Sequence, residues 1–489
     1  MLIIALILIP SLAGISAFFI RNDPARRMLL AATAVIHLFL SFQAVSQIPL
    51  SPANCCWLAL DPLGGLFLMI TSLLFAVVSI YSVGYLGREG IGEKKDFVSS
   101  YFFVNAPEAV FTGCLLLFLA TMTMVTTSQH MGLLWVAVEA TTLTSAPLIY
   151  FHRHHRSLEA AWKYLLICSV GIAIALLGTF FLAVAASNQD IPLTVNGLMT
   201  HASNLEPTWL KAAFIFFIVG YGTKMGLAPL NTWLPDAHSE SPSLVSALMS
   251  GALLNCAFLG ILRMFQVASS AGLAPFGQGI LLILGLASMA LAAIFILGQT
   301  DYKRMLAYSS VEHMGILSFG VGLGGAGAFG AMLHAVNHSL TKGMLFMVAG
   351  NALTAFKTKS TLEVKGMLRL IPVSGALWIA GILAITGSPP FGPFISEFTI
   401  LKAALDQGEW LAAVLYLSFL AVIFVAMATI GIRMAFGTLE NGVAMAKKEP
   451  VLSIAPCIAL GALVLFLGLY VPPSLGVIIH EAARSLGFL

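Results

Sequence analysis

Four charged residues lie inside long apolar stretches of a chain in which only 9% of residues are charged: Glu139, Lys224, Lys342 and Glu397. A charge near the centre of a bilayer costs about 2.5–3.5 kcal/mol on insertion scales. Charges that are kept at membrane depth usually mark a path for ions or protons. These four residues are therefore the first candidates for chemistry, and they suggest proton or cation transfer.

Two histidines share the apolar stretch that contains Lys342. His334, His338 and Lys342 follow one another at intervals of four residues, which places them on one face of a helix. A histidine titrates near neutral pH and suits a proton relay. Histidines that only hydrogen-bond across helices are the alternative. A metal site is disfavoured, because the sequence shows no nearby cysteine or carboxylate to complete it.

Glu139 and Lys224 are expected to interact. A buried carboxylate tends to take up a proton unless a cation lies within about 4–6 Å. Lys224 is the natural partner, because its interrupted stretch belongs to the same half of the chain. A static pair that only fastens helices together is the alternative. Buried pairs are poor stabilisers, since desolvation offsets their attraction, so the functional interpretation is preferred.

Other ionisable residues are candidates of lower rank. His313 follows Glu312 directly, and adjacent side chains point to different sides of a helix; His313 is the better relay candidate. Glu397 would be the terminal carboxylate for proton exchange, and Lys402 would pair with it or extend to the membrane surface. The basic stretch 152–155 and its histidines are expected to face solvent.

The composition indicates a membrane protein. Of the 489 residues, 59% are hydrophobic, and the mean hydropathy is +0.96, which soluble domains do not reach. Apolar stretches of about 20 residues recur, and each can cross about 30 Å of hydrocarbon. A net charge of +3 without a long basic run argues against nucleic acid as a partner.

No motif for a cofactor or metal is present in the sequence. The six cysteines form no CxxC pair and no cluster with histidine, so neither an iron–sulfur nor a zinc site is indicated. Cys55 and Cys56 are adjacent in an expected loop, which disfavours a disulfide between them. No phosphate loop or nucleotide fingerprint appears. Redox chemistry would therefore take place on other chains.

The apolar pattern predicts an all-α polytopic membrane protein, folded as a single membrane domain over residues 1–489. We expect about fourteen transmembrane helices. Their predicted ranges are 2–20, 28–48, 62–86, 109–128, 131–150, 161–186, 211–230, 243–268, 276–298, 303–323, 327–352, 372–405 (interrupted), 411–436 and 451–471.

The lysine and arginine distribution agrees with that count. When the loops are assigned alternately to two sides, 18 of the 24 lysines and arginines fall on one side, and only Lys211, Arg263 and Arg484 fall on the other. The remaining three lie within the predicted helices. The excess marks the cytoplasmic side, so both termini are expected outside the cytoplasm, in a cell inner membrane. The first stretch has no positive charge before it and is interpreted as a retained helix; a cleaved signal peptide is the alternative.

The layout of the helices predicts an internal repeat. Residues 109–268 and 276–436 each hold five helices in a similar order, and an odd number makes the second copy inverted across the membrane. Residues 1–108 would be N-terminal helices, and residues 437–489 would hold a C-terminal helix.

Each predicted repeat contains an interrupted helix, GTKMGLAP at 222–229 and GSPPFGPFISE at 387–397. Proline removes a backbone donor and breaks the helical ladder. Broken helices at matching positions point to a transport site, and both breaks adjoin an ionisable residue. Simple proline kinks are the alternative.

Five stretches together indicate a family. They are LWVAVEATTL at 134–143, EAAWKYLLICSVG at 159–171, KMGLAPLNTWLPDAH at 224–238, QTDYKRMLAYSSVEHMG at 299–315 and FISEF at 394–398. The last three resemble the antiporter-like subunits of respiratory complex I, Mrp-type cation/proton antiporters and membrane-bound hydrogenases. The first two are most similar to the hydrogenase-4 component F branch of that family.

The resemblance implies a fourteen-helix fold with two inverted five-helix repeats. It also implies a proton path in which Glu139 and Lys224 form the first half-channel and Glu397 is the exit carboxylate. Many relatives carry lysine or histidine at the position that best matches Asn255, and asparagine cannot titrate. The residues expected along the path are Glu139, Lys224, Asn255, His313, His334, His338, Lys342 and Glu397.

The expected function is that of a proton-translocating subunit in a redox-driven respiratory or hydrogenase complex. The partners would be other membrane subunits, peripheral redox subunits that carry iron–sulfur and nickel–iron centres, and the lipid bilayer. This chain would hold no cofactor. Three alternatives stay open: a Mrp-like sodium/proton antiporter subunit, an inactive structural platform, which Asn255 would suit, and coupling to a carbon-dioxide-hydrating partner.

Overall fold

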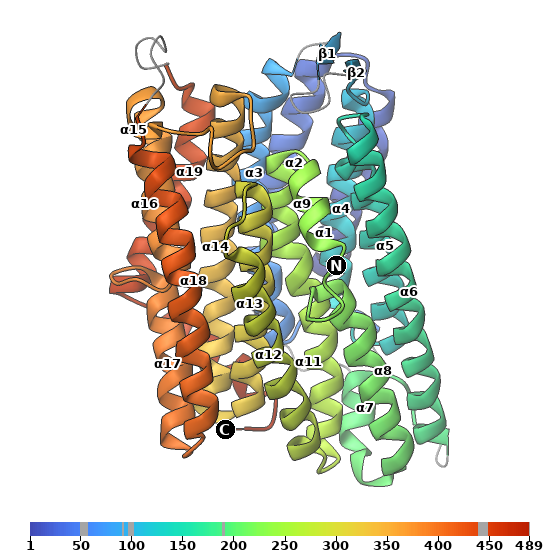
Figure 1. The fold of residues 1–489 in the computed structure, drawn as a ribbon. Coiled ribbons are helices and arrows are strands. Elements are labelled where there is room, and N and C mark those ends of the chain that lie inside the picture. Colours follow the sequence, from blue (N-terminus) through green and yellow to red (C-terminus); the bar gives the residue numbers. More distant parts are fainter. Residues whose placement is uncertain (49–56, 90–91, 96–101, 188–190, 439–447, 489) are drawn as a thin grey trace.

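Long helices make up nearly all of the computed structural model, which describes residues 1–48, 57–89, 92–95, 102–187, 191–438 and 448–488. Figure 1 shows them running roughly parallel in one bundle. The helices are α1 (Leu2–Phe19), α2 (Asp23–Ser46), α3 (Pro62–Arg88), α4 (Glu108–Thr127), α5 (Met131–Ile149), α6 (His155–Ala186), α7 (Val195–Thr200), α8 (Pro207–Met225), α9 (Leu234–Glu240), α10 (Ser243–Leu248), the π-helical turn η3 (Met249–Leu253), α11 (Leu254–Ser270), α12 (Ala274–Ile296), α13 (Tyr302–Leu323), α14 (Gly325–Phe356), α15 (Met367–Leu370), α16 (Pro372–Ile385), α17 (Gly392–Asp406), α18 (Trp410–Phe436), α19 (Val451–Leu469) and α20 (Pro473–Arg484).

A helix lies at each of the fourteen predicted ranges, and most boundaries agree within a few residues. The largest shifts are at α6, which begins six residues before the predicted 161, at α2, which begins five residues before the predicted 28, and at α8, which ends at Met225 instead of 230. Among the described residues, ten helices are long and apolar enough to cross a membrane by themselves. The chain is therefore a multi-span helical membrane protein.

The prediction of an all-α fold needs one correction. Strands β1 (Glu93–Lys95) and β2 (Phe102–Val104) pair antiparallel, with Glu93 opposite Val104. Figure 1 shows this hairpin at the opposite end of the bundle from the C-terminus. Strands of three residues are too short to leave a period-two pattern in the sequence. Cys55 and Cys56 lie outside the described residues.

Side-chain oxygens and prolines explain where two central helices begin. Asp61 Oδ1 accepts a hydrogen bond from the Gly64 amide at 3.1 Å, and Pro62 takes the first helical position of α3. Asp301 Oδ1 accepts from the amides of Lys303 and Arg304, at 2.7 and 3.1 Å, at the start of α13. Such caps satisfy amides that have no partner inside the helix.

The helices divide into buried inner helices and lipid-facing outer ones. Along α10, η3 and α11 the apolar stretch is entirely buried, and α14 is buried along most of its length. Outer helices such as α6 and α18 expose large apolar side chains, among them Val170 and Leu411. Helices that are buried on every side can hold polar groups away from lipid, which places the ionisable residues of α13 and α14 at the centre.

Two helices are interrupted, as predicted. Helix α8 ends at Met225 with Gly226 at φ 83°, and the chain resumes as α9 at Leu234. Helix α16 ends at Ile385, Gly387 has φ 68°, and α17 begins at Gly392. Glycine takes positive φ without strain. Backbone groups that leave the helical ladder are available to other partners at both breaks.

A buried ion pair fastens the start of α3 to α11. The guanidinium of Arg263 donates two hydrogen bonds to the two oxygens of Asp61, each at 2.6 Å. The Arg263 side chain is only 1% exposed. Arg263 lies inside α11, within the predicted helix 243–268, although the loop assignment counted it on one side of the membrane. Its charge is compensated by Asp61, about 200 positions earlier in the chain.

We expect Arg263→Ala to destabilise the protein by about 3–5 kcal/mol, because removing one partner of a buried pair leaves the other uncompensated. Thermal unfolding of the purified chain in detergent measures this. Arg484→Ala is the control, since Arg484 is 63% exposed and makes only a weak contact with Glu481, 3.9 Å away. This substitution should change the melting temperature little. Equal melting of both variants would contradict the prediction.

Candidate functional site

Lys224 lies at the centre of a hydrogen-bonded chain between α5, α6 and α8. Its Nζ donates to Thr142 Oγ1 and to the Tyr164 hydroxyl, both at 2.6 Å. Thr142 Oγ1 in turn donates to Glu139 Oε2 at 3.3 Å, and Ser169 Oγ donates to Glu139 Oε1 at 2.9 Å. The predicted partners Glu139 and Lys224 are therefore connected, but through a hydroxyl and not by a direct ion pair within the described chain.

The break after α8 explains why a lysine is stable at this depth. Lys224 is in the last turn of α8 and fully buried. The end of a helix presents carbonyl oxygens and a negative dipole, which favour a cation. Trp233 Nε1 donates to the Thr223 carbonyl at 2.8 Å and holds the interrupted segment against α8.

Asn255 joins the first half of the chain to the second. Its Nδ2 donates to the Gly251 carbonyl at 2.9 Å and to Ser339 Oγ of α14 at 2.8 Å. Its Oδ1 is buried and has no hydrogen-bond partner among the described residues. The π-helical turn η3 ends two residues before Asn255, and such turns are frequent at functional sites. Asn255 thus presents a free acceptor at the junction.

Lys342 is the second buried lysine, and it lies between α14 and α13. Its side chain is fully buried, and its Nζ donates to the Leu306 carbonyl at 2.7 Å. One turn earlier on α14, His338 is also fully buried, and both of its ring nitrogens lack a partner within the part of the chain that the structure describes. His334, His338 and Lys342 thus all lie in the buried part of α14.

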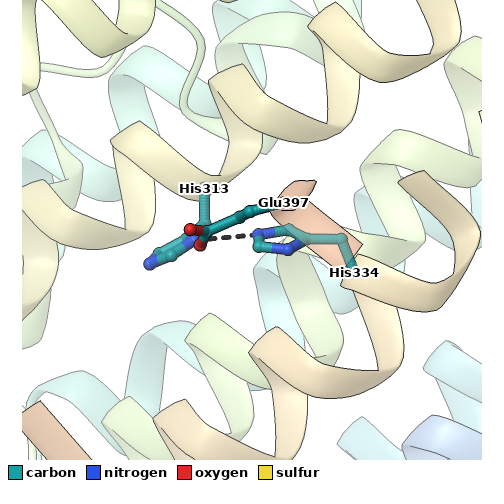
Figure 2. A group of neighbouring side chains, drawn as sticks. All are labelled: His313, His334 and Glu397. Carbon is teal, nitrogen blue, oxygen red and sulfur yellow. Dashed lines mark hydrogen bonds between the residues drawn. The ribbon is translucent and has the colours of Figure 1, made fainter. Parts of the chain in front are cut away.

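A histidine–carboxylate cluster connects α13, α14 and α17. His313 Nδ1 and His334 Nε2 share a hydrogen bond of 2.9 Å, and Figure 2 shows the carboxylate of Glu397 beside this pair. His334 Nδ1 shares a second hydrogen bond of 2.9 Å with Ser396 Oγ. The His338 ring lies 5.0 Å from that of His313. Three residues far apart in the sequence therefore form one buried cluster.

Glycine makes room for Glu397. A Cβ atom on Gly387, in the break before α17, would meet the Glu397 carboxylate at 2.0 Å. Glu397 is 6% exposed, and its Oε1 has no hydrogen-bond partner. The second interrupted helix thus positions an ionisable group, as the first one positions Lys224.

Several expectations about neighbouring residues are corrected. Glu312 and His313 were expected to face different sides, but both are buried, and Glu312 Oε2 is 4.0 Å from His313 Nε2. Lys402 pairs with the exposed Asp406 and not with Glu397. His154 does not simply face solvent: its ring caps α6 by accepting from the Ser157 amide.

Sequence reasoning missed the uncharged members of both clusters. Thr142, Tyr164, Ser169 and Ser396 each bridge or hold an ionisable group. Their closeness in the sequence to ionisable residues could have indicated two of them. Thr142 is three residues after Glu139, on the same helix face, and Ser396 adjoins Glu397.

His238 of α9 is a further buried histidine. It is fully buried, and within the described residues both of its ring nitrogens lack a hydrogen-bond partner. Its ring stacks on Phe346 of α14, with centroids 5.0 Å apart. Asp236, two residues earlier on α9, pairs with Lys163 and Arg304.

A sequence profile described as NADH:quinone oxidoreductase/Mrp antiporter, TM matches residues 128–424, more than half of the chain. The chain belongs to this family. The matched range contains the hydrogen-bonded residues around Lys224 and the histidine–carboxylate cluster around Glu397. Hydrogenase-4 component F homolog of Methylacidiphilum infernorum is 36% identical over 421 residues, which cover 84% of this chain and 85% of that relative.

Two solved structures support the family fold. A chain of the archaeal membrane-bound sulfane sulfur reductase, a respiratory membrane complex, matches with a TM-score of 0.86 at 19% identity and covers 99% of this chain and 97% of its own. A chain of the Mrp complex from Dietzia sp. matches with a TM-score of 0.83 at 18% identity, with the same two coverages. This member of the family therefore has the fold of subunits from multi-subunit membrane complexes.

We expect Thr142→Val to destabilise this family member by about 1–3 kcal/mol, because Lys224 would keep only one of its two buried partners. The matched control is Thr141→Val, since Thr141 Oγ1 donates only to the Val138 carbonyl of its own helix, at 2.6 Å. Thermal unfolding in detergent compares the two variants. A larger loss in the control would contradict the bridging role of Thr142.

Proposed function

We propose that this chain moves protons through the membrane as a subunit of a redox-driven complex of the respiratory or hydrogenase type, with hydrogenase-4 the nearest kind. The observation that carries the proposal is the hydrogen-bonded chain from Glu139 through Thr142 to Lys224, in which Thr142 and Lys224 are buried and Glu139 is half-buried. A hydroxyl that accepts from an ammonium and donates to a carboxylate can hand a proton between them. A charged side chain inside a membrane bundle costs free energy, and such residues are usually functional.

The proposed path continues through the second half of the chain. Asn255 and Ser339 connect α11 to α14, and the free Oδ1 of Asn255 can accept a hydrogen bond from water. From there the path runs by His338 and Lys342 to His313 and His334, and then to Glu397 as the exit carboxylate. Histidine can both accept and donate, which suits the segment between a lysine and a carboxylate.

Coupling to redox chemistry would be electrostatic. Electron transfer in peripheral partner subunits, which would carry the iron–sulfur and nickel–iron centres, changes the charge near Glu139 and Lys224. Because charges interact strongly at low dielectric, the proton occupancy of one group then shifts that of the next. This chain supplies the groups that bind and release protons and takes no part in electron transfer.

The membrane arrangement that we propose has fourteen spans in an inner membrane, with both termini outside the cytoplasm. Two inverted repeats, 109–268 and 276–436, would each contribute one broken helix, and 1–108 and 437–489 would flank them. The two observed breaks, after Met225 and after Ile385, support this arrangement. Each adjoins one of the ionisable clusters.

Lys224→Ala and Glu397→Ala should each lower redox-linked proton pumping about a hundredfold or more, the usual contribution of a positioned acid–base group. Proton uptake into inverted membrane vesicles, driven by the redox reaction of the complex, measures the effect. Copurification of the partner subunits checks assembly.

Lys402→Ala is the control, because Lys402 is 64% exposed and pairs with Asp406 on its own helix. It should pump normally. Normal pumping by both the Lys224 and the Glu397 variants would exclude the proposed path.

Sodium/proton antiport is the second candidate, and the fold shared with a chain of the Mrp complex favours it. We expect redox-linked proton uptake to persist when sodium is replaced by potassium in the same vesicles. The buried groups are nitrogens and single carboxylates, and sodium prefers several oxygen ligands as other hard cations do. Proton movement that requires sodium would support antiport instead.

A further inference from the structure

We propose that His313, His334 and Glu397 form a binding site for a divalent transition metal of the zinc class. One ligand atom from each residue lies within 4.8 Å of the other two. Figure 2 shows the two imidazoles and the carboxylate facing one another from α13, α14 and α17. The sequence disfavoured a metal here because no carboxylate was near the histidines, and the fold supplies it.

The facing nitrogens need only a small adjustment to hold a metal. His313 Nδ1 and His334 Nε2 are 2.9 Å apart, whereas two nitrogens about 2.0–2.1 Å from a tetrahedral zinc ion are about 3.3 Å apart. The two rings would separate by a few tenths of an ångström. Because they come from different helices, this movement does not strain either backbone.

His334 already has an outer partner of the kind that metal-bound imidazoles use, and His313 has a carboxylate nearby. If His334 binds through Nε2, its Nδ1 stays bonded to Ser396 Oγ at 2.9 Å. If His313 binds through Nδ1, its Nε2 is left 4.0 Å from Glu312 Oε2, which would have to move closer to accept a hydrogen bond. A carboxylate behind a histidine fixes the ring and raises its affinity for the metal. Glu312 thus has a role that its position beside His313 did not suggest.

The cluster has unmet polar capacity that a cation would satisfy. Within the described residues, Glu397 Oε1, Glu312 Oε2 and His313 Nε2 are buried without a hydrogen-bond partner. A divalent ion with the two carboxylates would be neutral overall, which lowers the cost of burying it. His37, a buried histidine outside the cluster, has both ring nitrogens bonded, to Thr123 and Ser72 at 3.0 and 3.1 Å.

The ligand chemistry selects the class of metal. Two imidazoles and one carboxylate suit zinc and its first-row neighbours, such as cobalt and copper. Magnesium and calcium favour sites of six or more oxygens and would bind poorly. Glu397 also lines a cavity of about 260 Å³ between α17 and α18, and its largely apolar walls predict slow entry of the ion.

Cobalt(II) is the probe for this site, because its visible absorption reports nitrogen and oxygen ligands directly. The purified full-length chain in detergent should bind one equivalent of cobalt with visible bands, and zinc should displace it. His334→Gln and Glu397→Gln should each weaken binding at least tenfold. Glu312→Gln, which removes only the outer carboxylate, should weaken it by about ten- to a hundredfold.

The control is His37→Gln, which removes a buried histidine outside the cluster and should bind cobalt as the unmodified chain does. If a ligand variant does not fold, Glu312→Gln still decides the question. Unchanged binding in the folded variants, or an equal loss in His37→Gln, would overturn the site.

A consequence for transport rests on the proposed function: zinc would occupy atoms that the proton path needs and would inhibit pumping. Cobalt binding is measured without any pumping, so the two ideas fail separately. Binding without inhibition supports the metal site and contradicts the path through it. Glu312→Gln lies outside the proposed path and should still pump protons. Zinc inhibition that stays unchanged in Glu312→Gln, although cobalt binding is weakened, would place the inhibitory ion elsewhere and overturn this consequence.

Discussion

The low polarity of the helix bundle determines how each charge inside it is placed. An ionised group in such surroundings must find a polar partner on another helix, because no bulk solvent is available to it. Lys224 meets this requirement with two hydroxyls and Arg263 with a bidentate carboxylate. The packing of α5, α6 and α8, and that of α3 with α11, is thus fixed by charge as well as by shape.

The interrupted helices are the local means by which this constraint is met. An uninterrupted helix uses all its backbone groups internally, so it offers nothing to a neighbouring ion. After Met225 the ladder stops one residue beyond Lys224, and after Ile385 it stops where Gly387 leaves space for Glu397. The two interrupted helices are therefore part of the fold and also position the ionisable groups of the candidate site.

The positions of the helices and of the buried charges were predictable, because long apolar runs and the rare charges within them are visible residue by residue. The bridging hydroxyls were not. Serine and threonine in membrane helices usually bond to a carbonyl one turn back, as Thr141 and Ser145 do. Only the packed structure shows that Thr142 turns to Lys224 instead. The meeting of His313, His334 and Glu397 was hidden for a similar reason, since three separate helices have to converge.

The π-helical turn η3 lets one additional residue enter a continuous helix without turning the residues that follow it. An α-helix advances by about 100° per residue, whereas the wider π-turn advances less per residue and so absorbs about one residue more than the α-helical repeat does. Asn255 therefore keeps its hydrogen bond to Ser339 although the turn Met249–Leu253 before it is wider than an α-helical turn. The contact between the two halves of the chain is thus compatible with one extra residue in a helix that otherwise looks regular.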